Sequence, residues 1–459
     1  MTSTAFASLP LSQAFLSNLQ DLAYREMTPI QAKALPEVLA GKDVKAQAKT
    51  GSGKTAAFGI GLLQKIDPAK FHPQALILCP TRELADQVSK ELRRLARPIP
   101  NTKILTLCGG TPIGPQFASL EHPPQIVVGT PGRILKHCTK GTLKLDQVQT
   151  LVLDEADRML DMGFSEDILA IISHTPQTRQ TLLFSATYPK EILAISASVQ
   201  RNPVDIKVES LHDDTVIKQL FIEVDKGGKS PALIALLQQY QPESCVVFCG
   251  RKDQCQSLAD ELNGHGLKAL ALHGDLEQKE RDLVLVQFSN RSIPILTATD
   301  VAARGLDIKE LGAVINYELS PDPEIYVHRI GRTGRAGNEG LALSLFHTSE
   351  APKVSAISSY LKQELSMAEV PSKTDAAKRI PEPAMATLCI SEGRKNKLRP
   401  ADVLGALTAG GKLLSSQIGK IDIFDFVAYV AVERKEAGKA LKLLSEGKIK
   451  GRKMLVRRV

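Results

Sequence analysis

The sequence predicts an α/β protein with two consecutive doubly wound domains and a small α+β domain at the carboxyl end. Three observations support this fold class. The chain has 459 residues, 43% apolar and 24% charged, which is typical of a soluble protein with two or three domains. Short apolar runs alternate with helical stretches as far as about residue 365. A polar segment with three prolines then precedes a basic tail.

The first domain is expected over residues 1–207 and the second over residues 217–365. Runs typical of parallel strands buried on both faces are ALILC, IVVGT, LVLDE and TLLFS in the first domain, and CVVFC, ALALHG, PILTAT, AVINYE and LALSLF in the second. Each domain should therefore contain a parallel sheet with its functional groups at the carboxyl ends of the strands.

Residues 366–383 are expected to be a linker, and residues 384–459 a third domain. The order of elements in this domain is strand, helix, strand, strand, helix and strand, as in RNA-recognition modules. It contains 16 Lys and Arg against 7 Asp and Glu, so it accounts for the whole net charge of +8. A polyanionic partner would require such a segment, although a solvated basic surface is the alternative.

Several classes of protein are disfavoured. No stretch is typical of a membrane span or a secretory leader, so a cytoplasmic protein is expected. Seven scattered cysteines do not form a disulfide framework. Cys245 and Cys249 would lie on one face of a strand, where buried thiols are more common than metal ligands, so no zinc site is assigned.

The segment AKTGSGKT is typical of a phosphate-binding loop between a strand and a helix. Its backbone N–H groups can surround phosphates, Lys54 can reach the terminal phosphates, and Thr55 can bind Mg²⁺. Ala48 stands where the general pattern has glycine. We therefore expect ATP and Mg²⁺ to bind here, and the residues assigned are Ala48, Thr50, Gly51, Ser52, Gly53, Lys54 and Thr55.

The quartet DEAD, residues 154–157, follows the apolar run LVL. Alone it could be a solvated helix start favoured by the helix dipole. With a phosphate-binding loop in the same domain, Asp154 can bind the metal beside Thr55. Glu155 is then free to act as the base for the water that attacks the γ-phosphate.

Together these motifs resemble those of DEAD-box RNA helicases, in family order through two RecA-like P-loop NTPase domains. The further matching segments are TPIQ, PTREL, GG, TPGR, SAT, FCGRK, HGDLEQKER, TATDVAARGLD and HRIGRTGR. The resemblance implies adenine recognition by Phe6 and Gln31, although Ala23 replaces a usual glycine. It also implies coupling of hydrolysis to unwinding through Ser185, Thr187 and Asp157.

In the second domain the resemblance implies that Arg332 and Arg335, spaced i, i+3, are arginine fingers toward the γ-phosphate. It implies that His328 contacts the acidic quartet and that Asp307 contacts the ribose. The RNA-backbone residues implied by position are Thr81, Arg82, Gly110, Thr130, Arg133, Gly274, Gln278, Arg281, Thr299 and Arg304.

For the tail, we predict RNA recognition by shape and backbone. The third strand of this domain keeps Tyr429 but has Val427 where a stacking aromatic is expected, so stacking on the sheet is poorly supported. The basic residues assigned to RNA are Arg394, Lys395, Lys397, Arg399, Lys448, Lys450, Arg452 and Lys453.

The function implied is an RNA-stimulated ATPase that separates short RNA duplexes. The tail is similar to the extra domain of bacterial family members that bind a hairpin in large-subunit (23S) rRNA, which implies a role in 50S ribosomal subunit assembly. The alternatives are an ATP-gated RNA clamp or chaperone, a different structured RNA target, and a DNA-directed motor. The chain is expected to be a monomer, with a dimer as the alternative.

Overall fold

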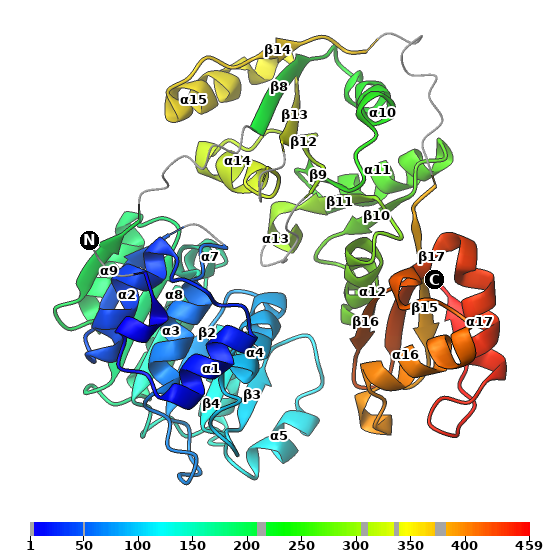
Figure 1. The fold of residues 1–459 in the computed structure, drawn as a ribbon. Helices are drawn as coiled ribbons and strands as arrows, with labels where there is room; N and C mark the ends of the chain where they lie inside the picture. The colour runs from blue at the N-terminus through cyan, green and yellow to red at the C-terminus, as the bar shows by residue number, and fades with distance from the viewer. Residues whose placement is uncertain (1–3, 49–50, 209–216, 304–310, 335–338, 372–381) are drawn as a thin grey trace. The chain divides into compact units, whose positions relative to one another are not determined.

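The computed structural model describes residues 4–48, 51–208, 217–303, 311–334, 339–371 and 382–459. The described residues up to 208 belong to one compact unit, and those from 217 onwards belong to another (Figure 1). Within these ranges, no helix is both long and apolar enough to cross a membrane.

A seven-stranded parallel sheet forms the centre of the first unit, with the strand order β3-β4-β2-β5-β6-β1-β7. Its strands are β1 (Val44–Gln47), β2 (Ala75–Leu78), β3 (Ile104–Leu107), β4 (Ile126–Gly129), β5 (Thr150–Asp154), β6 (Gln180–Ser185) and β7 (Val204–Lys207). β2, β4, β5 and β6 are buried along their whole length, as expected for strands covered by helices on both faces.

Helices cover both faces of this sheet (Figure 1). They are η1 (Phe6–Ser8), α1 (Gln13–Asp21), α2 (Pro29–Leu39), α3 (Lys54–Leu63), α4 (Arg82–Leu95), α5 (Gly114–Leu120), α6 (Pro131–Thr139), α7 (Ala156–Asp161), α8 (Ser165–Ser173) and α9 (Lys190–Val199). Alternate residues of β2 enter different cores: Ala75 and Ile77 pack with α1 to α4, whereas Leu76 and Leu78 pack with α5 to α9. The period of two in a strand explains this division.

The second unit contains a second parallel sheet, with the order β10-β11-β9-β12-β13-β8-β14. Its strands are β8 (Ile217–Glu223), β9 (Cys245–Cys249), β10 (Ala269–Leu272), β11 (Ile295–Thr299), β12 (Ala313–Asn316), β13 (Gly340–Phe346) and β14 (Met367–Ala368). Its helices are α10 (Lys229–Tyr240), α11 (Lys252–Gly264), α12 (Gln278–Ser289), α13 (Asp300–Ala303), α14 (Pro323–Ile330), η2 (Thr348–Glu350) and α15 (Ala351–Leu361). Both sheets confirm the predicted doubly wound architecture.

The same unit ends in a four-stranded antiparallel sheet with the order β16-β17-β15-β18. Its elements are β15 (Met385–Ile390), η4 (Arg394–Asn396), α16 (Pro400–Thr408), η5 (Ala409–Gly411), η6 (Ser415–Gln417), β16 (Ile418–Ile423), β17 (Ala428–Glu433), η7 (Arg434–Glu436), α17 (Ala437–Glu446) and β18 (Val456–Arg458). One face of the sheet packs on α16 and α17 through a core that includes Leu388, Val403 and Leu444. The predicted α+β arrangement is confirmed.

The opposite face of this small sheet packs against α12 of the second parallel-sheet domain. Cys389 and Tyr429 form an apolar cluster with Val286, and Leu283 lies against it. Beside the cluster, the buried Thr387 hydroxyl lies 2.7 Å from Ser292 Oγ and accepts a 3.2 Å hydrogen bond from the Asn290 amide. The third domain is therefore docked on its neighbour through the face on which RNA-recognition modules ordinarily stack bases.

Candidate active site and nucleic-acid interface

Three of the predicted motifs follow neighbouring strands of the first sheet. The phosphate-binding loop follows β1, the DEAD quartet begins at the last residue of β5, and the SAT motif begins at the last residue of β6. The strand order β5-β6-β1 places their carboxyl ends side by side. This edge of a parallel sheet is where ligands bind in doubly wound folds.

The phosphate-binding loop is braced by the start of α2. Gln31 donates a 3.1 Å hydrogen bond from its amide to the Gly53 carbonyl, and Thr28 Oγ1 donates one of 2.8 Å to the Ser52 carbonyl. Gly53 has φ +94°, and a Cβ on it would lie 2.5 Å from Gln31 Nε2. Only glycine therefore fits this turn. The residue expected to read adenine is thus in direct contact with the loop expected to hold phosphate.

Glu155 lies in a buried group of charges. Its Oε1 is 3.3 Å from Lys54 Nζ and its Oε2 is 2.8 Å from Arg158 Nε, and the Lys54 and Glu155 side chains are 5% and 2% exposed. The backbone of Glu155 is left-handed, with φ 56° and ψ 51°. Residues other than glycine are strained in this backbone conformation. Such strain is common in functional residues.

Asp154 is fully enclosed at the end of β5. Burial raises the pKa of its carboxyl above the usual range, Lys54 opposes this rise, and the charge of Glu155 adds to it. Asp154 Oδ1 and Ser52 Oγ are buried and have no hydrogen-bond partner among the described residues. Carboxylate and hydroxyl oxygens are ligands that Mg²⁺ prefers, and a hydroxyl can also donate to a phosphate. The oxygens of this site therefore fit Mg²⁺, which Asp154 and Thr55 are expected to hold.

The SAT motif is hydrogen-bonded to the acidic quartet. Asp157 Oδ2 accepts hydrogen bonds from Thr187 Oγ1 at 3.0 Å, from the Thr187 N–H at 2.9 Å and from the Ala186 N–H at 3.2 Å. The Asp157 N–H donates to Ser185 Oγ at 3.2 Å. A displacement of the segment after β5 would therefore move the segment after β6, because these hydrogen bonds join the two.

The RNA-backbone motifs of the first unit follow the other half of the same sheet edge, after β3, β4 and β2. Thr81 caps α4 by accepting from the Leu84 N–H at 3.3 Å. Thr130 Oγ1 accepts from the Gly109 N–H at 3.4 Å, and Arg133 donates to the Thr111 carbonyl at 2.9 Å. Gly110 has φ 74°, which favours glycine. Hydroxyl, amide and guanidinium donors are thus gathered on one set of loops.

In the second unit, Gly274 and Gln278 follow β10, and Thr299 ends the neighbouring strand β11. Gln278 donates a 2.8 Å hydrogen bond to Asp282, and Arg281 donates one of 3.4 Å to the His273 carbonyl. Thr299 Oγ1 accepts from the Ala302 N–H at 3.4 Å and so caps α13.

The segment that contains the predicted arginine fingers follows α14. α14 ends at Ile330, so Arg332 lies beyond the end of this helix. Thr333 bridges to Leu311, and Gly334 has φ 68°. His328 lies in the last turn of α14. Four assigned residues lie outside the described ranges: Thr50, Arg304, Asp307 and Arg335.

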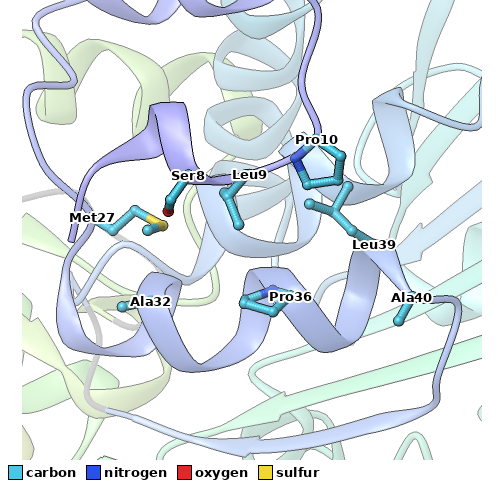
Figure 2. Close-up of a pocket in the computed structure, with 8 residues that line it drawn as sticks. All are labelled: Ser8, Leu9, Pro10, Met27, Ala32, Pro36, Leu39 and Ala40. Atoms are coloured by element: carbon cyan, nitrogen blue, oxygen red, sulfur yellow. The ribbon is translucent and has the colours of Figure 1, made fainter. Parts of the chain in front are cut away.

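A shallow apolar pocket of about 380 Å³ lies on another face of α2 (Figure 2). It is lined by Ser8, Leu9, Pro10, Met27, Ala32, Pro36, Leu39 and Ala40. None of these residues belongs to the phosphate-binding loop or the acidic quartet. Phe6, expected to stack on adenine, is 5% exposed and packs edge-on against Tyr24 with 6.1 Å between ring centroids. The pocket is therefore distinct from the predicted nucleotide site.

Comparison with known proteins identifies the family. The chain is 57% identical over 455 residues to the ATP-dependent RNA helicase DbpA of Escherichia coli (strain K12), and the alignment covers 99% of both chains. This chain belongs to the DbpA family of DEAD-box RNA helicases. The ATP-dependent RNA helicase DbpA of Bacillus subtilis (strain 168) is 37% identical over 472 residues, covering 98% of each chain.

Family profiles and solved structures agree with this assignment to the DbpA family. The profile of the DEAD/DEAH box helicase matches residues 28–195, that of the helicase conserved C-terminal domain matches 228–337, and that of the DbpA RNA binding domain matches 387–458. The structure of S. cerevisiae Dbp5 bound to RNA and ADP BeF3 has a TM-score of 0.73 and 30% identity, covering 80% of this chain and 96% of that one. The chain is therefore an ATP-dependent RNA helicase.

In the DbpA RNA binding domain, the predicted basic residues lie on two loops, one between β15 and α16 and one between α17 and β18. All eight are exposed. The Lys397 carbonyl accepts a 2.7 Å hydrogen bond from Lys450 Nζ, which joins the two loops. The Ser391 N–H donates to the Leu455 carbonyl at 3.0 Å. Segments that are about 50 residues apart in sequence thus form one cationic surface.

The sequence patterns missed one buried charge network of this DbpA-family helicase. Arg329 donates to both oxygens of Asp300 at 2.7 Å, to Asn316 Oδ1 at 3.0 Å and to the Glu318 carbonyl at 2.7 Å. Its side chain is 4% exposed. Asp300 and Arg329 belong to the segments TATDVAARGLD and HRIGRTGR. The available signal was one carboxylate and one guanidinium within these two motifs, because such groups can pair bidentately. This network holds the start of α13 against α14.

Proposed function

We propose that this DEAD-box RNA helicase acts on large-subunit (23S) ribosomal RNA in precursors of the 50S subunit, in the cytoplasm, and separates short duplexes there. The observation that supports the target is the cationic surface of the third domain. It presents eight exposed Lys and Arg side chains on two loops that are hydrogen-bonded to each other. Such a surface suits the phosphates of a folded RNA.

For hydrolysis, we assign Glu155 as the base and Lys54 as the phosphate ligand. Lys54 Nζ lies 3.3 Å from Glu155 Oε1. ATP phosphates would compete for Lys54 and weaken its ion pair with Glu155, whose carboxylate would then accept a proton from the attacking water. Bound Mg²⁺, held by Thr55 and Asp154, would neutralise charge on the phosphates. Substrate binding would thus activate its own base.

Gln31 would link the nucleotide base to the phosphate-binding loop. Gln31 accepts from the Thr28 N–H at 2.9 Å and donates to the Gly53 carbonyl at 3.1 Å. An adenine edge that took over these hydrogen bonds would release Gly53 and change the loop. Phe6 is assigned to the adenine ring.

We propose that hydrolysis is transmitted through Asp157 to Ser185 and Thr187, whose hydrogen bonds join the two segments. We assign Arg332 and Arg335 as arginine fingers, His328 to the acidic quartet and Asp307 to the ribose. The loops after β2, β3, β4, β10 and β11 are assigned to the RNA backbone, because their donors carry no base preference.

The target is tested by measuring ATP hydrolysis with no RNA, unstructured RNA, small-subunit rRNA and large-subunit rRNA. Deleting the third domain is a poor perturbation, because it would expose Leu283 and Val286 of α12. The intact chain with Lys395→Gln and Lys397→Gln is better. A second variant, Lys439→Gln and Lys442→Gln, makes the same charge change on exposed positions of α17 and serves as the control.

We expect large-subunit rRNA to stimulate the wild-type chain and the control best. The Lys395/Lys397 variant should lose that preference while unstructured RNA still stimulates it. The slope of log affinity against log salt should fall by roughly two for this variant. Equal stimulation by both ribosomal RNAs would refute the large-subunit target. Binding without turnover in the wild-type chain would favour the clamp.

A further inference from the structure

The sheet of the third domain does not offer its face to bases. Tyr429, the aromatic that the sequence retains on this sheet, is 7% exposed because Leu283 and Val286 of α12 cover it. Recognition of unpaired bases by RNA-recognition modules otherwise relies on aromatic rings at such positions. An aromatic contact to RNA must therefore come from outside the sheet.

Residues 384–459 contain three aromatic side chains, Phe424, Phe426 and Tyr429. Phe424 packs edge-on against Tyr429, with 5.7 Å between ring centroids, and belongs to the docked face. Phe426 is 72% exposed. It lies in the turn between β16 and β17, which the Phe424 N–H closes by donating to the Val427 carbonyl at 2.8 Å.

This turn is fixed to the cationic surface. The Arg394 N–H donates to the Phe424 carbonyl at 2.7 Å, and the Lys395 N–H donates to the Asp425 carbonyl at 2.9 Å. Arg394 also lies 3.5 Å from the Asp425 carboxylate. A Cβ at position 393 would lie 2.3 Å from the Phe424 carbonyl oxygen, so Gly393 permits the close approach of the two loops.

A single exposed aromatic ring is ordinary on a protein surface. Phe426 differs because its turn is hydrogen-bonded to the loop that carries Arg394, Lys395 and Lys397, all of them exposed. Cations suit phosphates and a flat apolar ring suits the face of an unpaired base, and the combination is what single-stranded RNA requires. A fully paired duplex would satisfy the cations but could not use the ring.

We propose that Phe426 stacks on an unpaired base of the bound RNA while the neighbouring Arg394, Lys395 and Lys397 contact its phosphates. The inference rests on the proposed role of the third domain in binding large-subunit rRNA, and it deepens that role. The base-binding position is the turn between β16 and β17, and its ligand is an unstacked nucleobase in a loop or junction.

The test uses the full chain with Phe426→Ala and Phe426→Trp. Phe71→Ala is the matched control, because Phe71 is also 72% exposed but lies in the first unit. Equilibrium affinity is measured for a large-subunit rRNA transcript, a small-subunit rRNA transcript and a fully paired RNA duplex, each over a range of salt. Urea unfolding of each variant checks that the fold is retained.

Phe426→Ala should bind large-subunit rRNA on the order of ten- to a hundredfold more weakly, with unchanged affinity for the duplex. Its salt slope should equal that of the wild type, because a ring carries no charge. Phe426→Trp and Phe71→Ala should bind like the wild type.

Stacking is overturned if Phe426→Ala binds large-subunit rRNA as tightly as the wild type, or if it loses the same factor on the duplex. Failure of the target is a different result, in which the wild type binds both ribosomal RNAs equally. In that case a selective loss by Phe426→Ala on both transcripts, but not on the duplex, would still support stacking.

Discussion

The docking of the third domain makes a prediction about Thr387→Val. The Thr387 side chain is fully buried, and its hydroxyl lies 2.7 Å from Ser292 Oγ and 3.2 Å from Asn290 Nδ2. Valine has nearly the same shape but no hydroxyl. The substitution therefore removes hydrogen bonds across the interface and leaves the volume of the contact almost unchanged.

The magnitude follows from the partners that remain. Ser292 Oγ still donates to the Gln287 carbonyl at 2.9 Å, so it keeps a partner. The Asn290 amide is the group that loses one, and leaving one buried polar group unsatisfied costs about 1–3 kcal/mol. The equilibrium between docked and undocked states should then shift by roughly 5- to 150-fold.

Hydrogen exchange of the intact protein measures this shift. Amides of α12 and β15 should exchange faster in Thr387→Val, whereas those of β4 in the first unit should not change. Thr408→Val is the control, because the Thr408 hydroxyl donates only locally, to the Leu404 carbonyl within α16. Wild-type exchange of α12 in Thr387→Val would refute the docked interface as a stable contact.

Three further predictions follow from single contacts. Ala23 has φ 63°, a backbone conformation that strains alanine. Ala23→Gly should therefore raise the free energy of unfolding, measured by urea titration, by about 0.5–1 kcal/mol. A lower free energy of unfolding would show that Ala23 is not strained. Thr187→Val removes the 3.0 Å hydrogen bond to Asp157 Oδ2. The number of duplexes separated per ATP hydrolysed should therefore fall, while RNA-stimulated hydrolysis persists. An equal loss of both activities would contradict a coupling role. Arg329→Gln and Asp300→Asn should each cost about 3–5 kcal/mol of stability, and the double variant should cost less than their sum; additive losses would contradict direct pairing.

Much of the active site could be predicted from the sequence, because its residues stand in contiguous motifs. A strand, a glycine-containing turn and a helix start are local patterns, so the segment around Lys54 and the pair Asp154 and Glu155 could be placed on them. The left-handed backbone of Glu155 could not be predicted. Glutamate has no intrinsic preference for that conformation, and only the surrounding charges and packing hold it there.

The end of α14 could not be predicted from the local sequence. The helix ends at Ile330, inside the motif HRIGRTGR. A bridge between Thr333 and Leu311 competes with the helix at this point. A partner 22 residues away in sequence leaves no trace in a helical period.

The sequence by itself determined the chemical groups, the two parallel-sheet domains, the small α+β domain and the concentration of positive charge in the tail. Tertiary structure alone decided the strand order that brings β5, β6 and β1 together, and the covering of Tyr429 by α12. The physical reason is the separation in sequence between the residues that carry each kind of information. Periodicity, turns and charge are written within a few residues, whereas sheet order and docking depend on burying apolar surface between distant segments, a force without direction or sequence signature.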